Sequence, residues 1–116
     1  LAMNYLTVYL QSTFASQGIR VNAVLPGSTD TGMKDEFTQM AGGEEALLSH
    51  CGYAKRLATS EEMAMPIVFL NSVMASYISG EHLIVDFSQT SEEIAGIKPV
   101  GQVISLKGIL EYTKNM

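Results

Sequence analysis

The chain has 116 residues, which is the length of one small domain. Hydrophobic residues make up 47% of it and charged residues 16%, so its composition excludes intrinsic disorder. The net charge of −5 excludes a protein that tracks nucleic-acid phosphates with a basic stripe.

Apolar runs and cysteine content narrow the class further. The longest apolar run, 63–70, is far shorter than the roughly 18 residues that a bilayer span needs. Cys51 is the single cysteine, which excludes an intrachain disulfide, and with two histidines it supplies too few ligands for a zinc cluster. We therefore expect a cytoplasmic protein without a metal site. No basic segment followed by an apolar one opens the chain, so no secretion signal is expected. Leu1 already lies inside a helical pattern, without a methionine or an N-cap, so the sequence reads as a piece of a longer one.

Residues 1–16 have the spacing of an amphipathic helix. The apolar face predicted to point inward holds Met3, Leu6, Leu10 and Phe14. A second stripe, which carries two tyrosines, holds Ala2, Tyr5, Tyr9, Ser12 and Ser16. This stripe is either a half-exposed flank of the helix or a contact between subunits, and large tyrosine side chains favour the contact. Gly18 suits the left-handed position that ends a helix.

Two short segments have the pattern of strands buried on both faces. The first, 19–25, is rich in β-branched residues and is followed by Pro26 and Gly27, which are expected to stop its ladder. The second is 82–86. A helix between two such strands makes a parallel, right-handed βαβ unit.

The helix between the strands is predicted to run from a capping box at 59–62 to about residue 75. Pro66 lies inside it and removes a hydrogen bond to the carbonyl of Glu62, so a kink or a restart of the helix is expected there. Its inward face is predicted to hold Met63, Ile67, Leu70 and Met74.

The remaining segments are less regular. Residues 28–53 are polar and contain several glycines, as in a lid or binding loop, with short helices predicted at 33–40 and 44–50. Residues 89–98 are predicted to be a loop, followed by a strand at 103–106 and a short helix at 108–114.

Two segments carry a resemblance to a known family. They read G-I-R-V-N-A-V-L-P-G-S-T-D-T-G-M at 18–33, and A-K-R-L-A-T-S-E-E-M-A through A-S-Y-I-S-G-E-H-L-I-V-D at 54–86. Together they resemble the C-terminal half of the short-chain dehydrogenase/reductase family. The resemblance covers 1–88 and implies an α/β fold, the C-terminal part of a doubly wound parallel-sheet (Rossmann) domain, with 89–116 as an extension. It also implies an NAD(P)-dependent oxidoreductase.

The family's reaction depends on a serine, a tyrosine and a lysine. When the chains are aligned on Gly18, the lysine falls immediately before Leu1 and the tyrosine one turn further upstream. No glycine-rich phosphate loop occurs in 1–116. The resemblance thus implies an enzyme fragment without catalytic residues, which is expected to be inactive alone. The alternative is a catalytically inactive remnant that acts only in oligomer contacts.

The intact protein is expected to be a homodimer or homotetramer, with 1–16 and 60–86 as contact surfaces. Its partner would be a small alcohol or carbonyl substrate, with no nucleic acid or membrane involved.

The resemblance implies four cofactor-binding residues, Pro26, Gly27, Thr29 and Thr31. They follow the first strand, at the carboxyl end where open α/β sheets bind ligands. The backbone of Thr29, where relatives often have Ile or Val, would meet the nicotinamide carboxamide, and the Thr31 hydroxyl would bond the carboxamide or the diphosphate. The alternative for Thr31 is a local turn in which its hydroxyl bonds the backbone. The resemblance implies NAD or NADP as the cofactor. The residues that decide between the two would lie upstream of Leu1, so the sequence does not choose between them.

The segment 33–53 corresponds to the family's substrate lid. Met33, Phe37 and Met40 are the candidate substrate-binding residues, and methionines suit bulky, irregular ligands. A hydrophobic alcohol or ketone, such as a hydroxysteroid or a 3-oxoacyl compound, is therefore a candidate substrate. The alternative is that these side chains pack the lid onto the body of the protein.

The sequence departs from the family at three glycines. Lys55 replaces the glycine that precedes Arg56, and Phe87 and Ser88 replace the two that follow Asp86. The sequence therefore does not decide the backbone conformation at these positions.

Other polar residues are assigned structural roles. His50 and Cys51 lack a third ligand or an orienting acid at a useful spacing. Asn22 is expected to stabilise the sheet, and Arg56 to form an ion pair.

Overall fold

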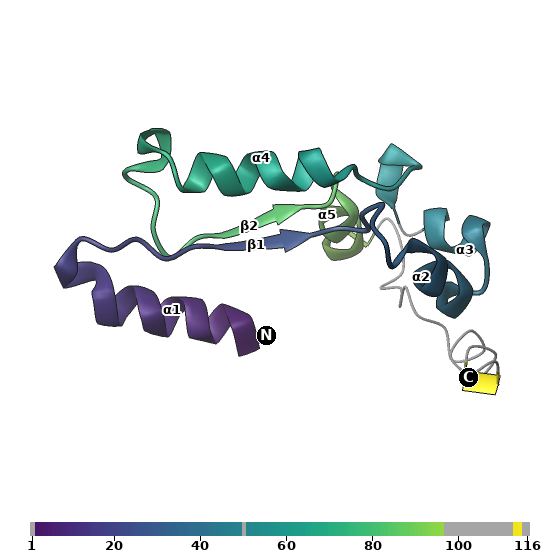
Figure 1. Ribbon diagram of the computed structural model, residues 1–116, viewed down its shortest axis with the longest axis horizontal. Coiled ribbons are helices and arrows are strands. Elements are labelled where there is room, and N and C mark those ends of the chain that lie inside the picture. The colour runs from purple at the N-terminus through teal and green to yellow at the C-terminus, as the bar shows by residue number, and fades with distance from the viewer. Residues whose placement is uncertain (1, 50, 97–112, 115–116) are drawn as a thin grey trace. The chain divides into compact units, whose positions relative to one another are not determined.

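The computed structural model describes residues 2–49, 51–96 and 113–114 (Figure 1). It divides into two compact units. The first, here called the sheet unit, comprises Leu1–Pro26 and Glu61–Val85, and the second, the loop unit, comprises Gly27–Ser60 and Asp86–Met116.

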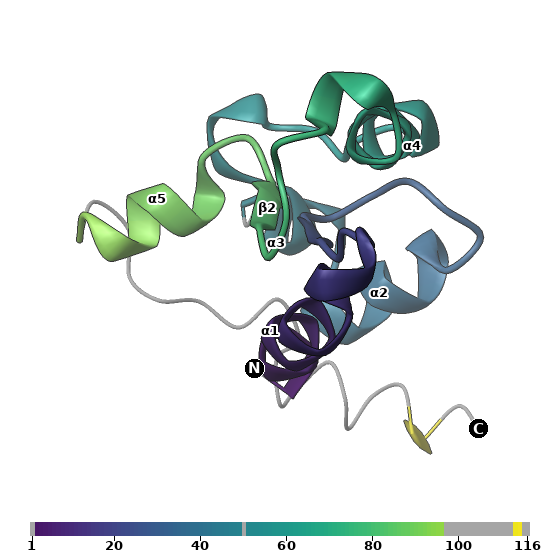
Figure 2. The same cartoon turned by 90° about the vertical axis from the view of Figure 1, so that its left-hand side faces the viewer.

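The sheet unit is built on a pair of parallel strands. In chain order its elements are α1 (Ala2–Phe14), η1 (Ala15–Gln17), β1 (Ala23–Pro26), α4 (Ser60–Leu70), η3 (Val73–Ala75) and β2 (His82–Val85). β1 pairs with β2 from Ala23 opposite His82 to Pro26 opposite Val85, so the predicted parallel pair is confirmed. α1 and α4 lie on opposite sides of the strands in both views (Figure 1, Figure 2).

β1 begins at Ala23, later than the predicted start at residue 19. The residues before it are held by one backbone bond, from the Gly80 N–H to the Val21 carbonyl, together with side-chain bonds. The Val21 N–H donates to Ser79 Oγ at 3.1 Å, and the Glu81 N–H donates to the side-chain oxygen of Asn22 at 3.0 Å. The predicted structural role of Asn22 is therefore confirmed.

The strands are half-buried, so the prediction of strands buried on both faces was wrong. Ile84 in β2 is 47% exposed. Among the described residues β1 pairs with β2 alone, and a groove of about 620 Å³ runs along β1. Its apolar lining includes Leu6, Leu10, Leu25 and Leu70. Pro26 is the last paired residue of β1, one position later than predicted, because a terminal proline removes only the N–H that a longer ladder would need.

α1 presents a narrower buried face than its sequence predicts. Gly18 has a left-handed φ of 74° and ends η1, as expected. Met3 is 66% exposed and Leu6 45% exposed, so the predicted inward face was wrong at its start, whereas Thr7 is buried. Tyr5 and Tyr9 of the second stripe are exposed.

α4 begins at Ser60, directly after Thr59, as the capping box predicts. It continues through Pro66 without restarting and ends at Leu70, before the predicted end at residue 75. Ser72 then accepts a hydrogen bond from the Met74 N–H at 3.2 Å and starts η3.

This change of helix type alters the predicted inward face of α4. Leu70 is buried and Met63 is half-buried, as expected. Ile67 is 48% exposed and Met74 is 79% exposed, so both assignments were wrong. Met74 belongs to the 3-10 turn, whose side chains no longer follow the α-helical spacing.

The loop unit contains α2 (Lys34–Ala41), α3 (Glu44–Ser49), η2 (Gly52–Ala54) and α5 (Gln89–Ile94). α2 and α3 match the helices predicted at 33–40 and 44–50 and contact each other. Gly42 and Gly43, with φ of 97° and 127°, make the turn between them. Ala41, Leu47 and Cys51 are buried in this unit.

α5 lies in a segment predicted to be a loop, so that prediction was wrong. The Asp86 carboxylate accepts hydrogen bonds from the N–H and the hydroxyl of Thr90, at 2.9 and 2.5 Å. Ser88 Oγ donates to the buried carboxylate of Glu92 at 3.0 Å. These local bonds stabilise a helix whose sequence lacks the apolar periodicity from which helices are predicted.

The strand predicted at 103–106 lies outside the described residues. Of the helix predicted at 108–114, Thr113 and Lys114 are described, and both are helical. Within the described ranges, no helix has the length and apolar character that crossing a bilayer requires.

Candidate functional site

The loop that follows β1 is held in an extended conformation by Ala58. Thr29 and Ala58 form an isolated parallel bridge. The Ala58 N–H donates to the Ser28 carbonyl at 2.9 Å, and the Asp30 N–H donates to the Ala58 carbonyl at 2.8 Å. Because the bonds to Ala58 come from the residues on either side of Thr29, the N–H and C=O of Thr29 itself point to the opposite edge.

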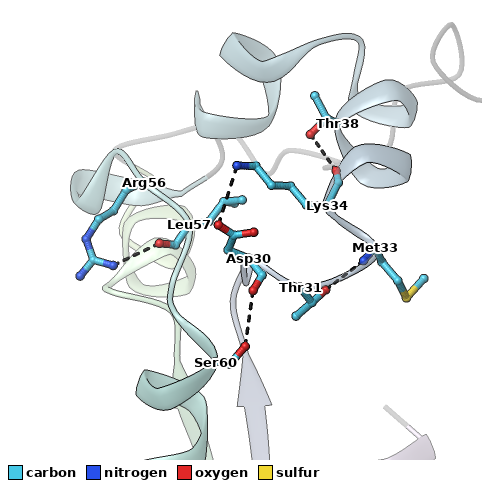
Figure 3. Close-up of polar contacts among 8 residues, drawn as sticks. All are labelled: Asp30, Thr31, Met33, Lys34, Thr38, Arg56, Leu57 and Ser60. Carbon is cyan, nitrogen blue, oxygen red and sulfur yellow. Dashed lines mark hydrogen bonds and ion pairs between the residues drawn. The ribbon is translucent and has the colours of Figure 1, made fainter.

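The side chains of both candidate threonines bond within the loop, and Figure 3 shows the bond of Thr31. The Thr29 hydroxyl donates to the Gly27 carbonyl at 3.0 Å. The Thr31 hydroxyl accepts from the Met33 N–H at 3.3 Å, which is the local turn considered as the alternative for this residue. A hydroxyl that accepts one bond retains its own proton, so Thr31 can still donate to a ligand. The turn and cofactor binding are therefore compatible.

An ion pair joins the loop to the start of α2 (Figure 3). Lys34 Nζ lies 3.8 Å from an oxygen of Asp30, one helical turn earlier. Ser60 Oγ donates to the backbone carbonyl of Asp30 at 3.4 Å. The pair is partly exposed, so it contributes only about 0.3–0.5 kcal/mol. The spacing of Asp30 and Lys34 could have been found in the sequence, whereas the bond from Ser60 had no sequence signal.

The candidate substrate residues differ in exposure. Met33, just before α2, is 51% exposed. Phe37 and Met40 lie on α2 and are half-buried in the unit where α2 contacts α3. Burial of Phe37 and Met40 fits the packing alternative, whereas Met33 remains accessible to a ligand.

Cys51 follows α3 and lies close to the loop. Its thiol donates to the Leu47 carbonyl at 3.5 Å, and its side chain also interacts with Ser28. Burial raises the pKa of the Cys51 thiol, and the hydrogen bond with Ser28 only partly opposes this shift. A raised pKa keeps the sulfur protonated, which is the opposite of what a nucleophile needs.

No metal centre is found in the part of the chain that the structure describes, where no group of three His, Cys, Asp or Glu side chains could hold an ion. His50 lies outside the described residues. Arg56 donates to the Leu57 carbonyl at 3.1 Å, and its ion pair stays a prediction.

Three described non-glycine residues have a left-handed backbone, and they stand at the positions where the family resemblance implies glycine. Lys55 has φ of 52°, Phe87 of 49° and Ser88 of 72°. The backbone at these positions thus has the conformation that favours glycine, although none of the three residues is a glycine.

Comparison with known proteins connects this geometry to a family. Residues 1–87 match the sequence model of a family described as enoyl-(acyl carrier protein) reductase. The chain is 44% identical over 77 residues to an uncharacterized oxidoreductase, YmfI, of Bacillus subtilis, covering 66% of this chain and 31% of that protein. It is 42% identical over 69 residues to L-rhamnose 1-dehydrogenase (NAD(P)(+)) of Azotobacter vinelandii, covering 60% of this chain and 27% of that one.

Solved structures show the same fold. A putative 2-deoxy-D-gluconate 3-dehydrogenase from Agrobacterium tumefaciens with bound NADP superposes with a TM-score of 0.68 and 34% identity, covering 76% of this chain and 35% of that one. The fold predicted from the sequence is therefore confirmed as an α/β fold with parallel strands, the C-terminal part of a Rossmann domain. The chain spans about a third of the length of the proteins described in these two paragraphs.

Proposed function

The chain belongs to the short-chain dehydrogenase/reductase family, and on that premise we propose that it forms the nicotinamide-side wall and substrate lid of an NAD(P)-dependent oxidoreductase. The intact enzyme would move hydride between the nicotinamide and an alcohol or ketone carbon. The observation that carries this proposal is the bridge between Thr29 and Ala58. It directs the N–H and C=O of Thr29, which have no partner among the described residues, away from Ala58.

These groups fit a nicotinamide carboxamide. A carboxamide offers both a donor and an acceptor, and the C=O and N–H of Thr29 complement the two. The Thr31 hydroxyl proton is available for a further bond to the carboxamide or the diphosphate. When bound, the nicotinamide supplies or accepts the hydride. Pro26 ends β1, and Gly27 follows it, so both would lie where the chain passes the cofactor.

The groups that perform proton transfer would precede Leu1. By family resemblance these are a tyrosine that acts as general acid and base, a lysine that lowers its pKa, a serine, and the phosphate-binding loop. The chain alone would then be inactive. An inactive remnant that acts only through oligomer contacts is the second candidate, and the exposed Tyr5 and Tyr9 on α1 favour an interface in either case.

The substrate would be a small alcohol or carbonyl compound held under the lid at 33–53. Met33, at 51% exposure, is the apolar lid side chain best able to contact it, with Phe37 and Met40 behind it. Hydroxysteroids and 3-oxoacyl compounds are the classes that such a surface suits.

A hybrid enzyme tests this function. Residues 1–32 and 54–87 of this chain would replace the corresponding segments of the Azotobacter L-rhamnose dehydrogenase, which keeps its own N-terminal part and lid. We expect the hybrid to bind NAD(P)H and to oxidise L-rhamnose, measured by fluorescence titration and by NAD(P)H formation. A folded hybrid that binds neither NADH nor NADPH would contradict the proposal and favour the inactive remnant.

A further inference from the structure

α1 is attached to the sheet by few contacts. Thr7 is its one buried residue among those described, and its hydroxyl donates to the Met3 carbonyl of the same helix at 2.8 Å. Thr13 bonds the Tyr9 carbonyl in the same way, at 2.8 Å. Within the described residues, the side-chain hydrogen bond that leaves α1 comes from Gln11.

Gln11 contacts the turn that leads into β2. Ser79 Oγ donates to the side-chain oxygen of Gln11, and it also accepts from the Val21 N–H at 3.1 Å. The Gly80 N–H donates to the Val21 carbonyl at 2.7 Å. Gly80 has φ of 78°, and a Cβ at this residue would lie 3.3 Å from Cγ of Gln11. Gln11 therefore lies closely over Gly80 and is linked through Ser79 to the segment before β1.

We propose that Gln11 is a positioning residue that sets the tilt of α1 against the parallel strands. The inference rests on the proposed function, because the tilt matters only if α1 continues into the residues that transfer the proton. α1 runs back beside β1, so that its first turn lies toward the carboxyl end of that strand (Figure 1). Gln11 thus acts at one end of the helix and determines where the other end lies.

The part of α1 between Gln11 and the first turn is long enough for a small tilt to affect the reaction. From Gln11 to Ala2 the helix extends about 14 Å, so a tilt of about 10° would move its first turn by about 2 Å. Displacements of about 1 Å can lower reaction rates by about a hundredfold. Because few other contacts restrain α1, loss of the bond to Ser79 permits such a tilt.

The test compares matched variants in the hybrid enzyme described above. Gln11→Met keeps the length of the side chain but removes the acceptor, whereas Gln11→Glu keeps an acceptor for Ser79. We expect Gln11→Met to lower kcat by about tenfold and to shift the pH profile of kcat, with little change in KM for the cofactor. Gln11→Glu should restore kcat to within about threefold of the unsubstituted hybrid.

Ser79 supplies an independent pair of variants. Ser79→Thr keeps the hydroxyl and should retain kcat, whereas Ser79→Ala should lower kcat at least as far as Gln11→Met does, because it also removes the bond from the Val21 N–H. Adding Gln11→Met to Ser79→Ala should then cost little more than Ser79→Ala alone, because that change already removes the bond to Gln11. Unchanged kcat and an unchanged pH profile in Gln11→Met, with or without a lower melting temperature, would overturn the inference.

Failure of the proposed function is distinguishable from failure of this inference. An unsubstituted hybrid that is folded but inactive counts against the function. Hydrogen exchange of the α1 amides in the hybrid then tests whether Gln11 holds α1 in place. Exchange about tenfold faster in Gln11→Met than in Gln11→Glu would support its role in holding α1, and equal exchange would overturn it.

Discussion

The guanidinium of Arg20 donates a 2.9 Å hydrogen bond to the backbone carbonyl of Ile78 from a position 58 residues earlier in the chain. Its second nitrogen donates to the carbonyl of Leu70 at 2.8 Å and to that of Ser72 at 3.4 Å. These carbonyls lie at and beyond the end of α4, where helix carbonyls lack partners within the helix. One side chain before β1 thus holds the connection from α4 to β2.

Replacing Arg20 should therefore destabilise the sheet unit. Arg20→Met keeps much of the apolar stem but removes one donor from each of three carbonyls. The carbonyls of Ile78 and Ser72 keep bonds from the Asn22 amide and the Ala75 N–H, so we expect the free energy of unfolding to fall by about 1–2 kcal/mol. Urea unfolding of the hybrid enzyme, followed by circular dichroism, measures this. Arg20→Lys can donate to fewer of the carbonyls, so its free energy of unfolding should lie between those of Arg20→Met and the unsubstituted hybrid. A loss below about 0.5 kcal/mol in Arg20→Met would show that these bonds are not needed.

Restoring a glycine after Asp86 should stabilise the protein. Phe87 has a positive φ of 49° and is 65% exposed, so Phe87→Gly removes backbone strain at little cost in buried surface. We expect a gain of about 1 kcal/mol in the free energy of unfolding. Phe87→Ala retains a Cβ and should give no such gain. Ser88→Gly should gain less than Phe87→Gly, because it also removes the bond from Ser88 to Glu92. Equal stabilities for the glycine and alanine variants of Phe87 would contradict the assignment of strain.

The hydroxyl of Thr31 should contribute to cofactor affinity. Thr31→Val is similar in shape but lacks the donor, and in the hybrid we expect Kd for NAD(P)H to rise by about tenfold. Thr31→Ser keeps the hydroxyl and should stay within about threefold of the parent. Calorimetric titration measures both. If Thr31→Val binds as tightly as Thr31→Ser, the hydroxyl serves only the turn with Met33.

Cys51 should make stability depend on alkaline pH. Burial raises the pKa of its thiol from the ordinary 9.0, so the folded protein holds the proton more tightly than the unfolded chain does. The resulting stabilisation is complete below pH 9.0 and is lost as the pH rises through the folded pKa. Unfolding midpoints of this chain, measured from pH 8 upward, should fall in the unsubstituted protein and fall less in Cys51→Ala. Identical slopes would show that Cys51 does not titrate with unfolding.

The chain by itself should bind nicotinamide nucleotides poorly. It has the carboxamide contacts proposed for Thr29 and Thr31 but contains no glycine-rich phosphate loop in its 116 residues. Titration of the purified chain with NADH and with NADPH should show no saturation. Micromolar binding would mean that the phosphate loop is dispensable for affinity.

The parallel pairing of β1 with β2 could be predicted, because each strand is a short β-branched run and the intervening helix requires a crossover. The helices α2 and α3 could be predicted as well. The limits of β1 could not, since Ser79 and Asn22 side chains accept bonds from the Val21 and Glu81 N–H groups before it. α5 was missed because Asp86 caps it locally without an apolar pattern.

In the candidate site, family spacing identified Thr29 and Thr31. It could not identify Ala58, because a bridge partner from a distant loop leaves no trace in the residue type. Nor could it reveal that Lys55 and Phe87 adopt left-handed backbone conformations, because a non-glycine residue normally argues against them.

The bridge with Ala58 also bears on how this position tolerates sequence drift. The amide and carbonyl of Thr29 point outward whichever side chain the residue carries, because Ser28 and Asp30 fix their direction. A ligand held by main-chain atoms imposes no selection on side-chain identity. An aliphatic residue at position 29 would therefore present the same two main-chain groups as threonine does.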